Sequence, residues 1–196
     1  MTALPKTLLS ETDYLEGERV SPIRHEFVEG RVFAMAGASK RHGVISGNVF
    51  AALRGHLRGR PCQGFVADMK VRLAAANAYY YPDVVATCDE RDLSNTSPTD
   101  FLRHPCLVVE VLSPGTEQVD RREKWLNYRA LPSLQEYLLV DQDRCWVELY
   151  RRTATGWQQE VASELTEVLD LQSVGLSLAL SVVYEDIQWE VSADAA

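Results

Sequence analysis

The sequence predicts an α/β protein with a single-domain mixed β-sheet flanked by helices. Short segments rich in β-branched and aromatic residues recur along most of the chain, which is the composition of β-strands. Two longer segments with helical spacing interrupt them. At 196 residues the chain also has the usual size of one domain. We therefore expect an N-terminal lead-in over residues 1–20, one domain over 21–190 and a flexible tail over 191–196.

The first half of the chain predicts a hairpin, a helix and a pair of strands. HEFVEGRVFAMAG contains two short strands around the Glu29-Gly30 turn. Ser39 is suited to cap a helix, and apolar residues then recur at helical spacing, so we expect a helix over about 40–58. PCQGFVADMKVRL and AYYYPDVVAT follow, separated by the short gap AAANA, and should pair as antiparallel strands.

The second half predicts a buried strand, a second helix and three further strands. The polar segment ERDLSNTSPTDFLRH leads into PCLVVEVLS, whose nearly continuous apolar run suits a strand buried on both faces. Ser113-Pro114-Gly115 ends that strand, and TEQVDRREKWLNYRA follows as a helix with a polar face. The three strands are EYLLVD, CWVELYRR and GWQQEVA, and the pattern of VLDLQSVGLSLALSVVYEDI allows a short strand and a terminal helix.

The composition is that of a globular protein without a membrane span. Hydrophobic residues make up 46% and charged residues 24%, and no run approaches the roughly 18 apolar residues that a span requires. The first twenty residues lack the apolar stretch of a signal peptide, so we expect a cytoplasmic location. The four scattered cysteines form no CxxC pair, and we expect buried free thiols in preference to disulfides or a zinc site at Cys62, Cys88, Cys106 and Cys145.

The net charge of −8 counts against a broad electrostatic grip on nucleic acid, because phosphate neutralisation supplies most non-specific affinity. Two basic clusters could contact phosphates locally while the rest of the surface stays acidic. The first comprises Arg54, Arg58 and Arg60, and the second comprises Arg121, Arg122 and Lys124. A solvated face is the alternative interpretation of both clusters.

An acidic residue within the most apolar strand is the first indication of chemistry. An ionised Glu110 inside LVVEVL carries a large desolvation cost unless a cation or a set of hydrogen bonds compensates it. Asp83 follows Pro82 in the neighbouring apolar segment, so pairing of the two strands could bring both carboxylates to one end of the sheet. Two carboxylates there suit Mg²⁺ or Mn²⁺, which can lower the pKa of a bound water and stabilise the charge of phosphodiester attack.

A lysine beside such a site would orient or help deprotonate the attacking water, or stabilise the charge that develops on the phosphate. Leu112 occupies the most direct position, two residues after Glu110 on the same strand face. Lys124 on the following helix is the substitute that we expect, and it stacks with Asp120 and Tyr128 at successive spacings of four residues. The alternative for this stripe is a solvent-facing ion pair between Asp120 and Lys124, worth a few tenths of a kcal/mol.

The segments YPDVV and LVVEVLSP together resemble the PD-(D/E)XK signature of restriction-endonuclease-like nucleases. The surrounding chain is similar to one branch, the restriction endonucleases called the Uma-two family. The similarity runs from HEFVEGRVFAMAGASKRH through EVLSPGT and DRREKWLNY to EYLLVD, and it covers about residues 22–185. It implies a restriction-endonuclease-like fold and a Mg²⁺-dependent or Mn²⁺-dependent endonuclease that hydrolyses DNA.

In this branch EVLS stands where other branches have ExK, and a lysine on the next helix takes over the missing role, which is the pattern of Leu112 and Lys124. The resemblance implies metal ligands at Asp83, Glu110 and the backbone carbonyl of Val111, with Lys124 as the catalytic lysine. Glu26 and His42 match further polar positions of the family pattern, where the glutamate would reach the metal or its water.

Glu26 and His42 also have interpretations in which their roles are purely structural. Glu26 could be a strand-edge carboxylate near a turn, and His42 a residue that hydrogen-bonds near the cap of its helix. Asp68 and Lys70 alternate on one strand and could be mistaken for the acid and the lysine of the motif, but their half-polar surroundings favour a solvated face.

We expect a homodimer, because nucleases commonly cut two strands by pairing two sites. One alternative function is a nuclease-fold binding or assembly module with little or no catalysis, which the acidic net charge and Leu112 favour. A hydrolase of another ester is a third interpretation, since a fold does not fix its substrate.

Overall fold

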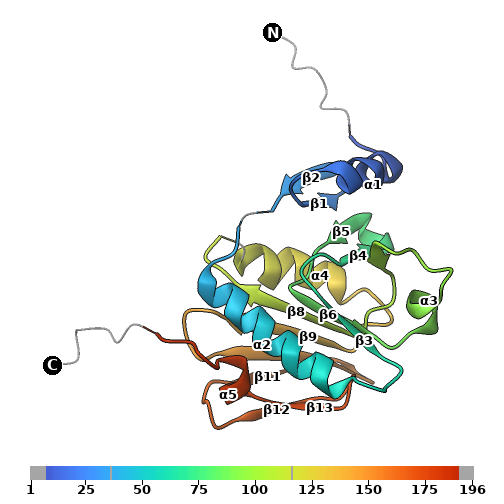
Figure 1. Ribbon diagram of the computed structural model, residues 1–196. Helices are drawn as coiled ribbons and strands as arrows, with labels where there is room; N and C mark the ends of the chain where they lie inside the picture. The colour runs from blue at the N-terminus through green and yellow to red at the C-terminus, as the bar shows by residue number, and fades with distance from the viewer. Residues whose placement is uncertain (1–7, 36, 116, 190–196) are drawn as a thin grey trace.

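The computed structural model describes residues 8–35, 37–115 and 117–189, and within them the protein is a mixed α/β fold (Figure 1). The fold class expected from the sequence is confirmed, although the strands divide among three sheets. Residues 1–7 of the expected lead-in and the expected tail over 191–196 lie outside the described residues. Within the described ranges, no helix is long and apolar enough to cross a membrane.

The largest sheet contains the strand of Glu110. Its six strands run in the order β11 (Gly156–Ala162), β10 (Val147–Thr153), β9 (Glu136–Asp141), β8 (Leu107–Leu112), β6 (Val84–Thr87) and β3 (Gln63–Val66). β8 and β9 are parallel, and the other neighbouring strands are antiparallel. Every residue of β8 is buried, as its apolar run predicts, and β6 beside it is buried as well.

A second sheet contains the expected hairpin. Its strands are ordered β2 (Arg31–Ala34), β1 (His25–Val28), β5 (Ala78–Tyr80), β4 (Lys70–Leu73) and β7 (Phe101–Leu102). The β1–β2 turn lies at Glu29-Gly30, where both residues have positive φ. A third, two-stranded sheet pairs β12 (Val168–Leu171) with β13 (Leu176–Ala179).

The expected antiparallel pairing of the two segments before and after AAANA is confirmed, but it is divided between sheets. β4 pairs with β5 in the second sheet, whereas β3 pairs with β6 in the largest sheet. Residues of one continuous segment therefore reach both sheets. This division sets β6, which directly follows Asp83, beside β8.

Helices cover both faces of the largest sheet (Figure 1). α2 (Lys40–His56) begins after Ser39, whose hydroxyl accepts a hydrogen bond from the His42 N–H, and it packs on one face. The π-helical turn η2 (Val119–Lys124) continues into α4 (Trp125–Tyr128), and this helix packs on the other face. The shorter helices are α1 (Glu11–Val20), η1 (Ala74–Ala76), α3 (Glu90–Leu93) and α5 (Leu180–Val183).

Alternation along β8 separates two hydrophobic cores. Val109 and Val111 belong to the core beneath α2, and Val108 and Leu112 belong to the core that contains Tyr128 of α4. Glu110 lies between Val108 and Leu112 on the second of these faces. The strand therefore presents its carboxylate to the face that the helix of Lys124 covers.

Some elements differ from the expectation. The lead-in contains α1, which buries Tyr14 and Glu18, and the polar segment before β8 contains α3 and β7. Lys70 was expected on a solvated face, but it is only 5% exposed because β4 is an inner strand of its sheet. Its Nζ lies 3.8 Å from Oδ2 of Asp100, whereas Asp68 is exposed as expected.

The expectation of four free thiols is wrong. Cys62 and Cys88 form a disulfide, and Cys106 and Cys145 are free. The β3–β6 register pairs Gln63 with Thr87, and one further step brings Cys62 opposite Cys88. Two cysteines separated by 26 positions in the sequence thus become neighbours through strand pairing.

Candidate active site

Asp83 and Glu110 lie at the same end of two adjacent antiparallel strands. The register pairs Val84 with Val109, so one further step sets Asp83 opposite Glu110 on the same face of the sheet. The Val111 N–H donates a 2.7 Å hydrogen bond to Oδ2 of Asp83. The side-by-side pairing that the sequence suggested for these two segments is therefore confirmed.

The Lys124 ammonium lies among three carboxylates. Its Nζ is 2.9 Å from Oε1 of Glu26, 3.1 Å from Oδ1 of Asp120 and 3.4 Å from Oε1 of Glu110. Both members of the Asp120–Lys124 pair are buried, so the solvent-facing alternative for this stripe is wrong. The π-helical turn widens the helix where these two residues project toward β8. The helix therefore places Lys124 beside Glu110, where Leu112 of the strand itself offers no charge.

Glu26 reaches the same point from the second sheet. It projects from β1, pairs with Lys124 and accepts a 3.3 Å hydrogen bond from the Tyr81 N–H. Its side chain is 14% exposed, and it therefore faces inward rather than lying at a solvated strand edge. Glu26 thus connects β1 to Lys124, and through it to β8.

His42 reaches the site from the first turn of α2. Its Nε2 lies 3.2 Å from Oδ2 of Asp83, and its ring also hydrogen-bonds the backbone of Val111. Burial lowers the pKa of His42, but the hydrogen bond to Asp83 and the charge of that carboxylate outweigh burial, so the pKa is raised. The ring therefore contacts two of the groups that the resemblance implies as metal ligands.

The charges of the site are not balanced. Burial raises the pKa of Glu110 well above its usual range against the opposing effect of Lys124, and Asp120, Asp83 and Glu26 raise it further. Burial also disfavours the charged form of Lys124, but its three carboxylate partners outweigh burial and raise the pKa of the ammonium. Lys124 is therefore positively charged, and it faces an excess of carboxylates.

The donor set suits a hard divalent cation. Carboxylate oxygens are the ligands that Mg²⁺ and Mn²⁺ prefer, and a second positive charge would lower the cost of ionising Glu110. Within residues 8–35, 37–115 and 117–189, no group of three or more His, Cys, Asp or Glu side chains is arranged to hold a metal ion. A cation at Asp83 and Glu110 would therefore complete its coordination with backbone oxygens or water, as Mg²⁺ commonly does.

The two basic clusters differ in their surroundings. Lys124 is buried, and Arg121 is paired with Glu117 at 2.7 Å and Glu148 at 2.5 Å. Arg54 is exposed near the end of α2, about 18 Å along the helix axis from His42, and Arg58 and Arg60 follow beyond it. The cluster of Arg54, Arg58 and Arg60 therefore lies far from Asp83. Contact between either cluster and a phosphate stays a prediction.

Asp120 is a site residue that the sequence alone presented only as a surface partner of Lys124. Its spacing of four residues from Lys124 places both on one helix face, but spacing does not say whether that face is buried. Its Oδ1 lies 3.1 Å from the lysine yet forms no well-directed hydrogen bond within the described chain. The buried hydroxyl of Tyr128, next along the stripe, also lacks a hydrogen-bond partner there.

Known proteins share this sequence and this fold. The model of the Uma2 family, described as "Putative restriction endonuclease", matches residues 12–182. The chain is 38% identical over 183 residues to the uncharacterized protein slr1290 of Synechocystis sp., covering 93% of this chain and 95% of that protein. It is 33% identical over 165 residues to the uncharacterized protein sll1609 of the same organism, covering 84% and 92% respectively.

A solved structure has the same fold. It is the crystal structure described as a "putative nuclease belonging to DUF820" from Anabaena variabilis, with a TM-score of 0.71 at 19% identity over 88% of this chain and 95% of that chain. The family match covers most of the sequence, and it includes β1, α2, β6, β8 and the helix of Lys124. The chain therefore belongs to the Uma2 family, whose description is "Putative restriction endonuclease".

Proposed function

We propose that this protein is a metal-dependent endonuclease that hydrolyses DNA phosphodiester bonds. The observation that carries the proposal is the buried Glu110, set opposite Asp83 and within 3.4 Å of Lys124. A carboxylate with this burial and this excess of negative neighbours is costly for folding, and such costs are commonly retained at functional sites. The family description, restriction endonuclease, supports DNA as the substrate.

Asp83, Glu110 and the carbonyl of Val111 would hold Mg²⁺ or Mn²⁺. When bound, the cation would lower the pKa of a water molecule and stabilise negative charge on the phosphate. The residues of the chain prepare this arrangement. The Val111 N–H and the His42 ring both contact Oδ2 of Asp83, so the orientation of that carboxylate is fixed before any ligand binds.

Lys124 would act through its charge. An ammonium held by three carboxylates keeps its proton, so it would donate a hydrogen bond to the attacking water or to a phosphate oxygen rather than accept a proton. Glu26 and Asp120 would position Lys124 from two sides. Of the three roles that the sequence left open for the lysine, orientation of the water and charge stabilisation are thus favoured over deprotonation of the water.

A homodimer is part of the proposal. β2 is the outer strand of its sheet, and all four of its residues are exposed, with Phe33 at 52%. Phe33 pairs with Glu26 across β1 and β2, so this exposed edge adjoins the site. An outer strand with exposed apolar side chains is a surface that a second copy can cover. Sedimentation equilibrium of the wild type and Phe33→Lys tests this, and a monomeric wild type would contradict it.

A catalytically silent binding or assembly module is the second candidate. It is favoured by the net charge of −8 and by the three carboxylates that already surround Lys124. The two candidates differ in one measurable respect. Only the enzyme would cleave DNA, and its cleavage would require a divalent cation and Asp83.

Cleavage of supercoiled plasmid and of a labelled DNA duplex, with Mg²⁺, with Mn²⁺ and with chelator, tests the proposal. We expect metal-dependent cleavage by the wild type and a loss of about 10²–10³-fold in Asp83→Asn. Asp170→Asn, an exposed carboxylate on β12, serves as the matched control and should retain the wild-type rate. Equal cleavage by wild type and Asp83→Asn would reject the site, and a folded wild type that cleaves nothing with either metal would favour the module.

A further inference from the structure

Three cysteine sulfurs meet at the end of the sheet opposite to the carboxylates. Asp83 precedes β6 and Cys88 follows it, while Cys106 precedes β8 and Glu110 lies near its other end. Because the two strands are antiparallel, the sulfurs lie about 15 Å along the strands from the carboxylates. The Sγ atom of the free Cys106 is 3.7 Å from Sγ of Cys88, which is bonded to Cys62.

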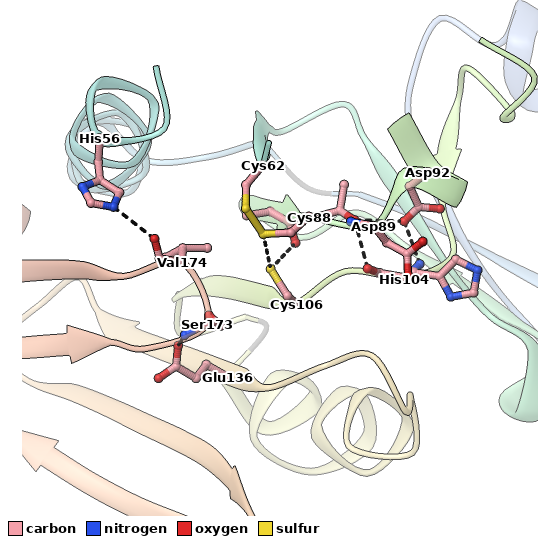
Figure 2. Close-up of a disulfide and its surroundings, with 12 residues drawn as sticks. His56, Cys62, Cys88, Asp89, Asp92, His104, Cys106, Glu136, Ser173 and Val174 are labelled. Atoms are coloured by element: carbon pink, nitrogen blue, oxygen red, sulfur yellow. Dashed lines mark hydrogen bonds between the residues drawn. A yellow bond between two sulfur atoms is a disulfide. The ribbon is translucent and has the colours of Figure 1, made fainter. Parts of the chain in front are cut away.

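The arrangement of the three sulfurs suits thiol–disulfide exchange. In that reaction a thiolate approaches one sulfur of a disulfide from the side opposite to the leaving sulfur. Figure 2 shows the Cys106 sulfur beyond Cys88, on the side away from Cys62. Cys106 is therefore positioned as an attacking group and Cys62 as the leaving group. Burial raises the pKa of the Cys106 thiol to about 11, so its thiolate is a minor form at neutral pH and the exchange speeds up as the pH rises toward that value.

A cavity of about 690 Å³ is lined by two of these cysteines. Cys88 and Cys106 line it, together with the basic side chains of Arg72, Arg91, Arg103 and His104. Asp89 also lines the cavity, but it is paired with Arg91, and Arg72 is paired with Glu11 outside the cavity. Within the part of the chain that the structure describes, Arg103 and His104 form no ion pair with a carboxylate. The Arg103 guanidinium is therefore the positive group of this lining that no carboxylate pairs within the described residues.

The segment that carries Arg103 and His104 is held in place. Oδ1 of the buried Asp92 accepts a 2.9 Å hydrogen bond from the Arg103 N–H, and Oδ2 accepts a 2.8 Å bond from the His104 N–H. The Thr87 hydroxyl donates a 3.0 Å bond to the carbonyl of His104. These contacts fix the segment of Arg103 and His104 relative to Cys88, one residue after Thr87 (Figure 2).

We propose that this cavity is a thiol–disulfide exchange site, in which Cys106 opens the Cys62–Cys88 bond and a small anionic thiol completes the reduction. The Cys106 thiolate attacks Sγ of Cys88. The Cys88–Cys106 bond forms, the Cys62–Cys88 bond breaks, and Cys62 takes the electron pair and the proton that Cys106 released. The new disulfide then lies between two cysteines that line the cavity.

The second half of the reaction uses the anionic thiol as the reductant. Its thiolate attacks Sγ of Cys106, which releases Cys88 as a thiolate and leaves a mixed disulfide on Cys106. A second thiol molecule displaces Cys106 and forms the small-molecule disulfide. In total, two thiol molecules are oxidised to one disulfide, and the protein disulfide is reduced to two thiols. The intermediate cross-link joins the ends of β6 and β8, the strands that carry Asp83 and Glu110 at their other ends.

The test measures reduction of the purified full chain by 2-mercaptoethanesulfonate, 2-mercaptoethanol and cysteamine, which are anionic, neutral and cationic thiols. Each rate is divided by the rate of the same thiol with a small uncharged disulfide, so that intrinsic reactivity cancels. We expect the corrected rate of the anionic thiol to exceed that of the cationic thiol by about tenfold or more. Arg103→Gln should reduce this preference about threefold.

Alkylation and peptide mapping of the quenched wild type should detect the Cys88–Cys106 bond with Cys62 alkylated. Cys106→Ser should slow reduction by about tenfold, whereas Cys145→Ser should react like the wild type. The proposal is overturned if the corrected rates of the three thiols are equal, if Cys106→Ser reacts at the wild-type rate, or if mapping finds the Cys62–Cys88 bond as the sole disulfide at every time point. The reaction needs neither DNA nor metal, so its outcome is independent of nuclease activity.

Discussion

The backbone N–H of Val111 donates a 2.7 Å hydrogen bond to the carboxylate of Asp83, and this contact joins the two acidic strands of the site. The pairing of β6 with β8 ends at Val84. Beyond that point the Asp83 side chain, in place of a backbone carbonyl, accepts the hydrogen bond of the Val111 N–H. Asp83 is thereby oriented by the strand that carries Glu110. The predictions below concern what this arrangement contributes to folding and what it contributes to chemistry.

Glu110 and Glu136 are both buried glutamates of the largest sheet, and we expect opposite responses to removal of their charge. Glu136 is saturated, because its oxygens accept hydrogen bonds from Arg151, from the Gln172 N–H and from both the N–H and the hydroxyl of Ser173. Glu136→Gln should therefore cost about 2–4 kcal/mol of unfolding free energy. Urea unfolding of the metal-free protein measures this.

Glu110→Gln should cost less than about 1 kcal/mol in the same measurement, or should stabilise the protein, because it removes repulsion from Asp83, Asp120 and Glu26. The exposed Glu160→Gln on β11 is the control for the substitution itself. If Glu110→Gln destabilised the metal-free protein as much as Glu136→Gln does, Glu110 would be a structural residue rather than a functional one.

Lys124→Met should be strongly destabilising. The substitution leaves Glu26, Asp120 and Glu110 without their shared cation in a buried position, and breaking such a group typically costs about 3–5 kcal/mol. The exposed Lys40→Met should change stability by less than about 0.5 kcal/mol. Chemical denaturation of both variants provides the comparison, and equal stability of Lys124→Met and wild type would mean that the carboxylates are not ionised in the folded protein.

His42→Ala should weaken binding of Mn²⁺ by about 10–100-fold while leaving the fold intact, because the ring orients Asp83 and the backbone of Val111 without being an expected ligand. His56→Ala is a matched control on the same helix, since that ring hydrogen-bonds the carbonyl of Val174 far from the carboxylates. Calorimetric titration gives both affinities. Wild-type affinity in His42→Ala would show that the Val111 N–H orients Asp83 without help.

Loss of the Cys62–Cys88 disulfide should lower stability. The bond closes a loop between positions 26 residues apart, and the chain-entropy relation gives about 3.5 kcal/mol for a loop of that size. Urea unfolding of the double variant Cys62→Ser/Cys88→Ser, in which Cys106 has no cysteine partner beside it, should show this loss relative to Cys145→Ser, which removes a free thiol. A difference below about 1 kcal/mol would indicate that the reduced chain is already restrained by the β3–β6 pairing.

Local patterns predicted the elements that make up the site. Ser39 starts α2, the Glu29-Gly30 turn joins the hairpin, and the apolar run around Glu110 forms a central strand, because each depends on neighbouring residues alone. The burial of Glu110 also follows from its neighbours. Pairing of Asp83 with that strand required only that two apolar segments meet in antiparallel order.

Features that depend on long-range packing were not predictable. The burial of Asp120 depends on which helix face β8 contacts, and the burial of Lys70 depends on its strand being an inner one. The Cys62–Cys88 bond depends on the register of β3 against β6, which no local pattern specifies. α1 lacks a broad apolar stripe, since Tyr14 and Glu18 are its buried residues, and the polar lead-in therefore did not indicate a helix.

Calorimetric titration of Mn²⁺ into the wild type and into Glu110→Gln tests the central claim, that Asp83 and Glu110 hold a divalent cation, most directly. We expect saturable binding at one site per chain in the wild type, a loss of affinity of at least about tenfold in Glu110→Gln, and wild-type affinity in the control Glu160→Gln. Equal affinity in all three proteins, or no binding to the wild type, would contradict the assignment of this carboxylate pair as a metal site.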